Sequence, residues 1–121
     1  MYNSLVLAYI GDSVYELYIR KYLIEQGLIK VKDLQKEAVK YVSAKGQASI
    51  LKQLLDNNKL TDEEIDIIKK ARNHKSHGSK TTDILTYKHA TALEALIGYL
   101  YLFKKYDRLD SIMNLVKETI C

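Results

Sequence analysis

Two carboxylates stand out because each lies within a largely apolar stretch with helical periodicity. Asp12 lies in the run from Leu5 to Ile24, and Glu94 is the only acid in residues 87–106. Burying an ionised carboxylate without a partner is costly in free energy. We therefore expect each acid to be hydrogen-bonded, paired with a cationic side chain or bound to a metal ion.

Each of these acids has a glycine close by. Gly11 precedes Asp12, and Gly98 lies one turn after Glu94. Glycines allow two helix backbones to approach closely, so the pattern predicts that the two helices pack together and bring the acids side by side. An ion pair or a backbone donor would be the simpler explanation for one such acid. Two of them, with no basic residue within one turn on the helix face, favour a shared hard cation such as Mg²⁺ or Mn²⁺.

The other titratable candidates carry weaker signals. Glu16 lies one turn after Asp12, and its expected role is exposed or capping rather than metal-binding. The spacing of His74 and His77 within a cationic stretch favours contact with solvent or phosphate over zinc binding. His89 has no evident partner and is interpreted as structural.

The positive charge is concentrated in one segment. Residues 69–80 hold five Lys and Arg and no acid, whereas the rest of the chain carries 14 basic and 15 acidic residues. A basic run is by default a solubilising surface. Beside a hard-metal site, it is better interpreted as a contact to a phosphate backbone.

Capping residues and helical periodicity predict the elements that position these groups. The pattern contains no strand signal, so the expected fold class is all-α. The first helix is apolar nearly all round and is expected to be central and buried, with its four tyrosines packing. The acids of the fourth helix are expected to be solvated or capping. The predicted helices run from Asn3 or Ser4 to about Gln26, after a cap at Asp33, from a cap at Ser43 to Asp56, from a capping box at Thr61 to Arg72, from Tyr87 to about Tyr106, and onward after Asp107.

Length and composition indicate one domain spanning residues 1–121. The chain is 47% hydrophobic and 28% charged, which is typical of a globular fold and argues against disorder. Gly11 and Asp12 interrupt the N-terminal apolar run, which also lacks a basic leader and therefore predicts neither a signal peptide nor a membrane span. The single cysteine, Cys121, suits a reducing compartment. The expected location is cytoplasmic.

Two motifs together resemble the signature helices of the ribonuclease III catalytic domain. They are Leu7-Ala8-Tyr9-Ile10-Gly11-Asp12-Ser13-Val14 and Glu94-Ala95-Leu96-Ile97-Gly98. The closer resemblance is to the Mini-III ribonucleases, which have no separate double-stranded-RNA-binding domain. Further matching stretches are Val42-Ser43-Ala44-Lys45, Gln47-Ala48, Arg72-Asn73, Lys75-Ser76, Thr82-Asp83 and Tyr99-Leu100-Tyr101-Leu102. The resemblance covers nearly the whole chain and implies a ribonuclease III-like fold of about six to seven helices. The N-terminus looks short relative to that of Mini-III proteins.

The resemblance also implies an activity. It indicates a Mg²⁺-dependent endoribonuclease, with Mn²⁺ able to substitute, that hydrolyses phosphodiester bonds of double-stranded RNA, precursor 23S ribosomal RNA in particular. Asp12 and Glu94 would be the catalytic and metal-binding residues. A homodimer is implied, with the first signature helix in a two-fold interface. The residues that would contact RNA phosphates or 2′-hydroxyl groups are Arg72, Asn73, Lys75, Ser76 and Lys80.

Two departures from the larger ribonuclease III pattern bear on mechanism. Ala8 and Thr91 stand where those enzymes have a glutamate and an aspartate, so only Asp12 and Glu94 remain of a four-acid cluster. Mini-III proteins are similarly reduced. Fewer carboxylates should weaken cation binding. The alternatives are therefore a non-catalytic helical dimeric RNA-binding module and a purely structural dimerisation domain.

Overall fold

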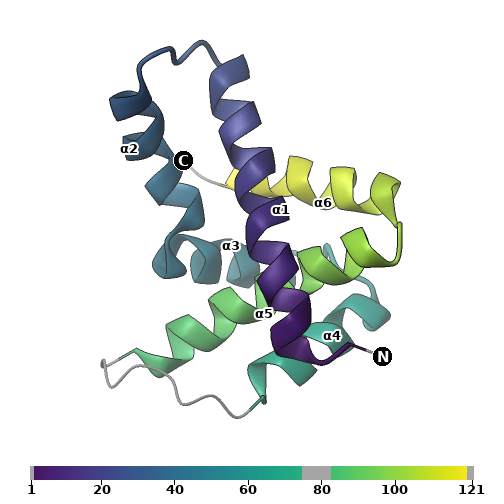
Figure 1. Ribbon diagram of the computed structural model, residues 1–121. Coiled ribbons are helices and arrows are strands. Elements are labelled where there is room, and N and C mark those ends of the chain that lie inside the picture. The colour runs from purple at the N-terminus through teal and green to yellow at the C-terminus, as the bar shows by residue number, and fades with distance from the viewer. Residues whose placement is uncertain (1, 75–82, 120–121) are drawn as a thin grey trace.

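The computed structural model describes residues 2–74 and 83–119, which form six α-helices and no strand. This confirms the predicted all-α class. In Figure 1, α1 crosses α5, and α5 also packs against α3, α4 and α6. The helices are α1 (Ser4–Glu25), α2 (Val31–Val42), α3 (Ala44–Asp56), α4 (Asp62–Arg72), α5 (Ile84–Leu102) and α6 (Tyr106–Thr119).

Side-chain caps begin three of these helices where the sequence predicts them. The Asn3 side chain accepts a hydrogen bond from the Val6 amide at 2.9 Å, and Ser43 Oγ accepts one from the Gly46 amide at 3.0 Å. Thr61 and Glu64 form the predicted reciprocal capping box, with bonds of 3.2 and 2.9 Å. Each cap satisfies an amide at the helix start that has no intrahelical acceptor.

Four predicted helix boundaries are wrong. Asp33 lies in the first turn of α2, whose N-cap is Lys30. The fifth helix begins earlier than expected, after an Asp83 cap, and ends at Leu102. It ends there because Lys104 adopts a left-handed backbone with φ 58°, and the amides of residues 104 and 105 bond back to carbonyls of the last turn. Glycine usually occupies such a position, so a lysine gives no stop signal, and α6 accordingly starts at Tyr106.

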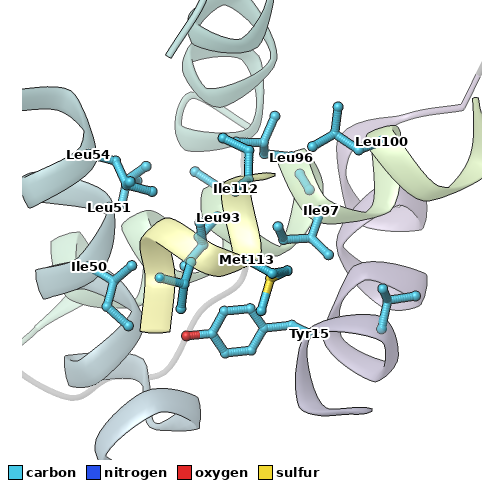
Figure 2. Packing of buried hydrophobic residues seen from close by; sticks show 14 of the residues in the cluster. Tyr15, Ile50, Leu51, Leu54, Leu93, Leu96, Ile97, Leu100, Ile112 and Met113 are labelled. Atoms are coloured by element: carbon cyan, nitrogen blue, oxygen red, sulfur yellow. The ribbon is translucent and has the colours of Figure 1, made fainter. Parts of the chain in front are cut away.

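The central helix is α5, not α1. Its buried residues face neighbours on every side, which explains why its sequence is apolar all round. Figure 2 shows its leucines and Ile97 packed against Tyr15 of α1, residues of α3, and Ile112 and Met113 of α6. The expectation that α1 is central is wrong, because α1 lies on the outside and several of its large apolar side chains are exposed.

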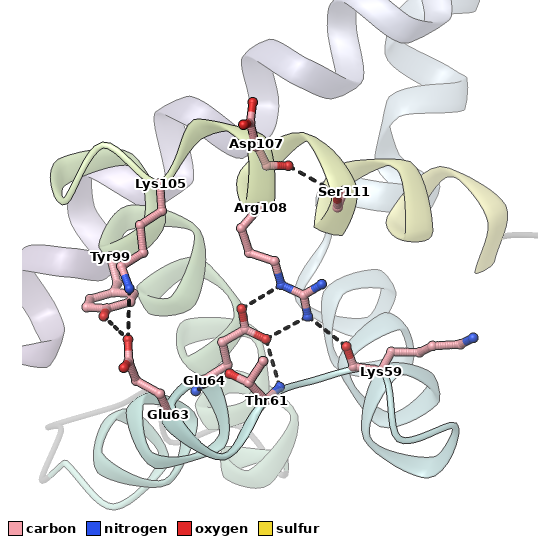
Figure 3. A network of polar contacts seen from close by, with 9 residues as sticks. All are labelled: Lys59, Thr61, Glu63, Glu64, Tyr99, Lys105, Asp107, Arg108 and Ser111. Carbon is pink, nitrogen blue, oxygen red and sulfur yellow. Dashed lines mark hydrogen bonds and ion pairs between the residues drawn. The ribbon is translucent and has the colours of Figure 1, made fainter.

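A polar network joins α4 to α6 (Figure 3). Arg108 donates to both carboxylate oxygens of Glu64, at 2.7 and 2.8 Å, and also to the Lys59 carbonyl. The acids of α4 are expected from the sequence to be solvated or capping. Glu64 is buried and caps the helix, so it is not solvated. On the surface beside this pair, Glu63 accepts hydrogen bonds from Tyr99 and Lys105. These contacts join α4 to α6 through Arg108 and to α5 through Tyr99.

Within the described ranges, none of the helices combines the length and the apolar character that crossing a membrane requires.

Candidate active site

Helices α1 and α5 touch backbone to backbone through the two predicted glycines. A Cβ atom added at Gly11 would lie 1.7 Å from the Glu94 carbonyl oxygen, and one added at Gly98 would lie 1.9 Å from the Leu7 carbonyl oxygen. Real Cβ atoms do not come so close to backbone atoms, so no other residue fits at either position without separating the helices. The close approach predicted from the sequence is therefore confirmed.

This contact brings Asp12 and Glu94 together within one chain. Burial raises the pKa of Glu94 to about 8, and the nearby carboxyl group of Asp12 adds to this effect. A pKa raised by burial and a like charge means that a nearby cation would stabilise the ionised pair.

Asp12 differs from expectation in its exposure. Its side chain is exposed, whereas Glu94 is half-buried. The reason is the position of α1 on the outside of the fold, which leaves Asp12 at the border between the buried face of the helix and its solvent face. Because the Asp12 side chain is exposed, its charged form bears little of the desolvation cost expected for a buried carboxylate. The pair is also accessible to solutes.

Sequence reasoning missed Gln47 as a site residue. It is 2% exposed, and its Nε2 atom donates to Glu94 Oε2 at 3.3 Å. A sequence signal for this role exists, because Gln47 lies on the same helical stripe as Ile50, Leu51 and Leu54, all of which are buried. A single amide on an apolar stripe indicates a buried hydrogen-bond partner.

Other α1 residues near the pair play different parts. Glu16 pairs with Arg20 at 2.8 Å on the surface, which agrees with the expected exposed role. Tyr15 is fully buried and donates to the Tyr41 carbonyl at 2.7 Å, and burial raises the pKa of its phenol. Tyr9 is 83% exposed, so the expectation that all four tyrosines of this helix are packing residues is wrong.

The chemistry of the donor set fits a hard divalent cation. Two carboxyl groups of like charge meet with an amide at one side, and carboxylate oxygens are ligands that Mg²⁺ and Mn²⁺ prefer. Ala8 and Thr91 are both buried and add no carboxylate. In the part of the chain that the structure describes, no cluster of three or more His, Cys, Asp or Glu side chains is placed to hold a metal.

The basic segment is described only at its start. Arg72 ends α4 and is half-buried, and Asn73 follows as its exposed C-cap. Ala71 and His74 line a small pocket with Leu5 and with Thr91, which lies one turn before Glu94 on α5. The segment therefore starts within a few turns of the carboxylate pair. The predicted contact residues Lys75, Ser76 and Lys80 lie outside the described residues, as does His77.

Comparison with known proteins assigns the fold to a family. Residues 5–105 match the ribonuclease III domain. The chain belongs to the ribonuclease III family. It is similar to the Mini-ribonuclease 3 of Staphylococcus aureus, at 46% identity over 93% of this chain and 84% of that protein. It is also similar to that of Brevibacillus brevis, at 49% identity over 93% and 83%.

A solved structure agrees with this assignment. A crystal structure of a protein from Fusobacterium nucleatum superposes with a TM-score of 0.82, at 40% identity, over 97% of this chain and 93% of that one. The ribonuclease III resemblance seen in the sequence is thereby confirmed, together with the all-helical fold. A member of this family with Mini-ribonuclease 3 relatives along most of its length is a ribonuclease.

Proposed function

We propose that this ribonuclease is a Mg²⁺-dependent endoribonuclease of double-stranded RNA, acting in the cytoplasm on precursor 23S ribosomal RNA. The observation that carries the proposal is the meeting of Asp12 and Glu94 across the Gly11–Gly98 contact, with the pKa of Glu94 raised to about 8. A pair of acids that repel each other at an accessible position is a candidate for cation-assisted phosphodiester hydrolysis.

Asp12 and Glu94 would hold the cation, with water or RNA phosphate as the remaining ligands. Mn²⁺ could replace Mg²⁺ because both accept carboxylate oxygens. When bound, such an ion supplies an activated water and neutralises charge on the phosphate and the leaving oxygen. Hydrolysis would join the water oxygen to phosphorus and break the bond to the 3′ oxygen, which would take up a proton, leaving 5′-phosphate and 3′-hydroxyl ends. The chain's own contribution is a rigid backbone contact that fixes the separation of the two acids.

The RNA contacts would come from the basic segment. Two of the predicted contact residues, Arg72 and Asn73, lie at the end of α4, close to the N-terminal half of α1 and to α5. Lys75, Ser76 and Lys80, which lie outside the described residues, would also contact the RNA backbone. Phosphate and 2′-hydroxyl contacts of this kind read A-form shape rather than sequence.

A homodimer would place two such sites on the two strands of one duplex. Support comes from the outer face of α1, where Val6, Tyr9 and Leu17 are 44, 83 and 66% exposed. These residues recur at helical spacing and form an apolar stripe that borders Asp12. A two-fold interface pairs one surface patch with its own copy, and this stripe suits that arrangement.

The test is cleavage of labelled duplex RNA with Mg²⁺ or with EDTA. We expect Mg²⁺-dependent cleavage by the wild type, and loss of cleavage with retained folding in Asp12→Asn and Glu94→Gln. The matched control is Glu16→Gln, which removes a surface acid of the same helix and should keep full activity. Duplex binding without Mg²⁺-dependent product would instead favour the non-catalytic RNA-binding module. A protein that neither binds nor cleaves duplex RNA would instead favour a purely structural dimerisation domain.

A further inference from the structure

The carboxylate pair has a third neighbour that belongs to neither signature motif. Gln47 comes from the first turn of α3, is 2% exposed, and donates from Nε2 to Glu94 Oε2 at 3.3 Å. A buried amide costs free energy unless it is hydrogen-bonded. Glu94 is the side chain that Gln47 meets, so the position of one group constrains the other.

The corner between α2 and α3 places Gln47 in this position. The backbone turns at Ser43, whose carbonyl oxygen accepts a hydrogen bond from the backbone N–H of Gln47 at 2.9 Å. At Gly46 an added Cβ would lie 2.2 Å from the Lys40 carbonyl oxygen, so the last turn of α2 presses directly on the first turn of α3. The start of α3 is therefore held by backbone contacts on the residue just before Gln47.

A second bond ties this corner to α1. Tyr15, one turn after Asp12, donates to the carbonyl of Tyr41, two residues before Ser43, at 2.7 Å. Both tyrosines are buried. The three elements thus form a closed arrangement in which α1 carries Asp12, α5 carries Glu94, and the α2–α3 corner carries Gln47 and is bonded to both helices.

We propose that Gln47 is a positioning residue that fixes the orientation in which Glu94 presents its carboxylate beside Asp12. An uncharged donor suits this role. A lysine at position 47 would compete with a cation for Glu94, and a glutamate would add to the repulsion between the two acids. Hydrogen-bond partners that orient metal ligands in this way affect cation affinity without touching the cation.

The inference rests on the proposed cation-dependent function, so the experiment measures cation binding and cleavage separately. Gln47→Met is nearly isosteric and lacks the amide donor. The matched control is Gln53→Met, because Gln53 lies on the same helix and its side-chain amide donates to the exposed Ser49 at the surface. Mn²⁺ binding is followed by calorimetry on RNA-free protein, and duplex cleavage is followed as a function of Mg²⁺ and RNA concentration.

We expect Gln47→Met to weaken Mn²⁺ binding by about 10-fold. It should also lower kcat at limiting Mg²⁺, with partial recovery at high Mg²⁺ and an unchanged KM for RNA. Gln53→Met should match the wild type in all of these. A folded Gln47→Met protein with wild-type Mn²⁺ affinity would show that Gln47 only fills space.

A measurement on the wild type covers the case in which Gln47→Met does not fold. Side-chain amide signals in nitrogen-15 NMR spectra should move for Gln47, and not for Gln53, when Mg²⁺ is added. An unmoved Gln47 signal in a protein that binds Mn²⁺ overturns the inference alone. A wild-type protein that neither binds Mn²⁺ nor cleaves duplex RNA overturns the proposed function, and the inference with it.

Discussion

Replacing Glu94 with glutamine should stabilise the metal-free protein at alkaline pH, even though the proposed function expects this variant to lose cleavage. Burial and the neighbouring Asp12 raise the pKa of Glu94 from 4.5 to about 8. Between these two values the folded chain retains a proton that the unfolded chain has lost. The free energy of unfolding of the wild type therefore falls as pH rises through this window, because the folded state binds more protons. A glutamine side chain cannot ionise, so the Glu94→Gln variant does not undergo this loss.

The size of the effect follows from the two pKa values. Their difference corresponds to about 4 to 5 kcal/mol once Glu94 is fully ionised in the folded protein. Part of this is lost when the side chain relaxes towards water. The glutamine oxygen can still accept from the Gln47 amide, so the substitution leaves no unsatisfied donor. We expect the free energy of unfolding of Glu94→Gln, relative to that of the wild type, to rise by about 1 to 3 kcal/mol between about pH 5.5 and about pH 8.5.

The assay is urea unfolding in EDTA at both pH values. Glu64→Gln is the control of opposite sign, since burial raises the pKa of Glu64 but its hydrogen bonds to Arg108 and Thr61 outweigh burial and lower it. That variant should lose stability at both pH values. Added Mg²⁺ should stabilise the wild type at the higher pH and leave Glu94→Gln unchanged. The same change in the free energy of unfolding between the two pH values, for the wild type and for Glu94→Gln in EDTA, would refute the reasoning.

Three further predictions concern the scaffold. Gly11→Ala should destabilise the protein by at least about 2 kcal/mol in urea unfolding, because its Cβ would meet the Glu94 carbonyl, and a loss below about 0.5 kcal/mol would contradict the backbone contact. Arg108→Met should cost about 2 to 3 kcal/mol in the same assay by leaving Glu64 buried without its cation, whereas wild-type stability would show the pair to be dispensable. If the proposed homodimer forms through the outer face of α1, Tyr9→Glu should lower the mass measured by light scattering from dimer to monomer without changing the circular dichroism spectrum, and an unchanged dimer mass would exclude this side chain from the interface.

Much of the local structure could be predicted from the sequence because it depends on neighbours along the chain. Asn3, Ser43 and Thr61 cap helices through bonds that span only a few residues. The end of α5 could not be predicted, because the left-handed residue there is Lys104 rather than glycine. The sequence likewise shows that Glu64 can cap α4. It does not show that Arg108, 44 residues later, makes Glu64 a buried ion pair.

The candidate site divides along the same line. The sequence by itself determined the two lone acids and the two glycines beside them, since periodicity along one helix reports which residues share a face. Only the tertiary structure decided that Asp12 is exposed at the edge of α1 and that Gln47 of a third helix reaches Glu94. The physical reason is that a helical pattern specifies a face but not the neighbour that will cover it. Here α5 is covered by α1, α3, α4 and α6, whereas α1 keeps one face exposed.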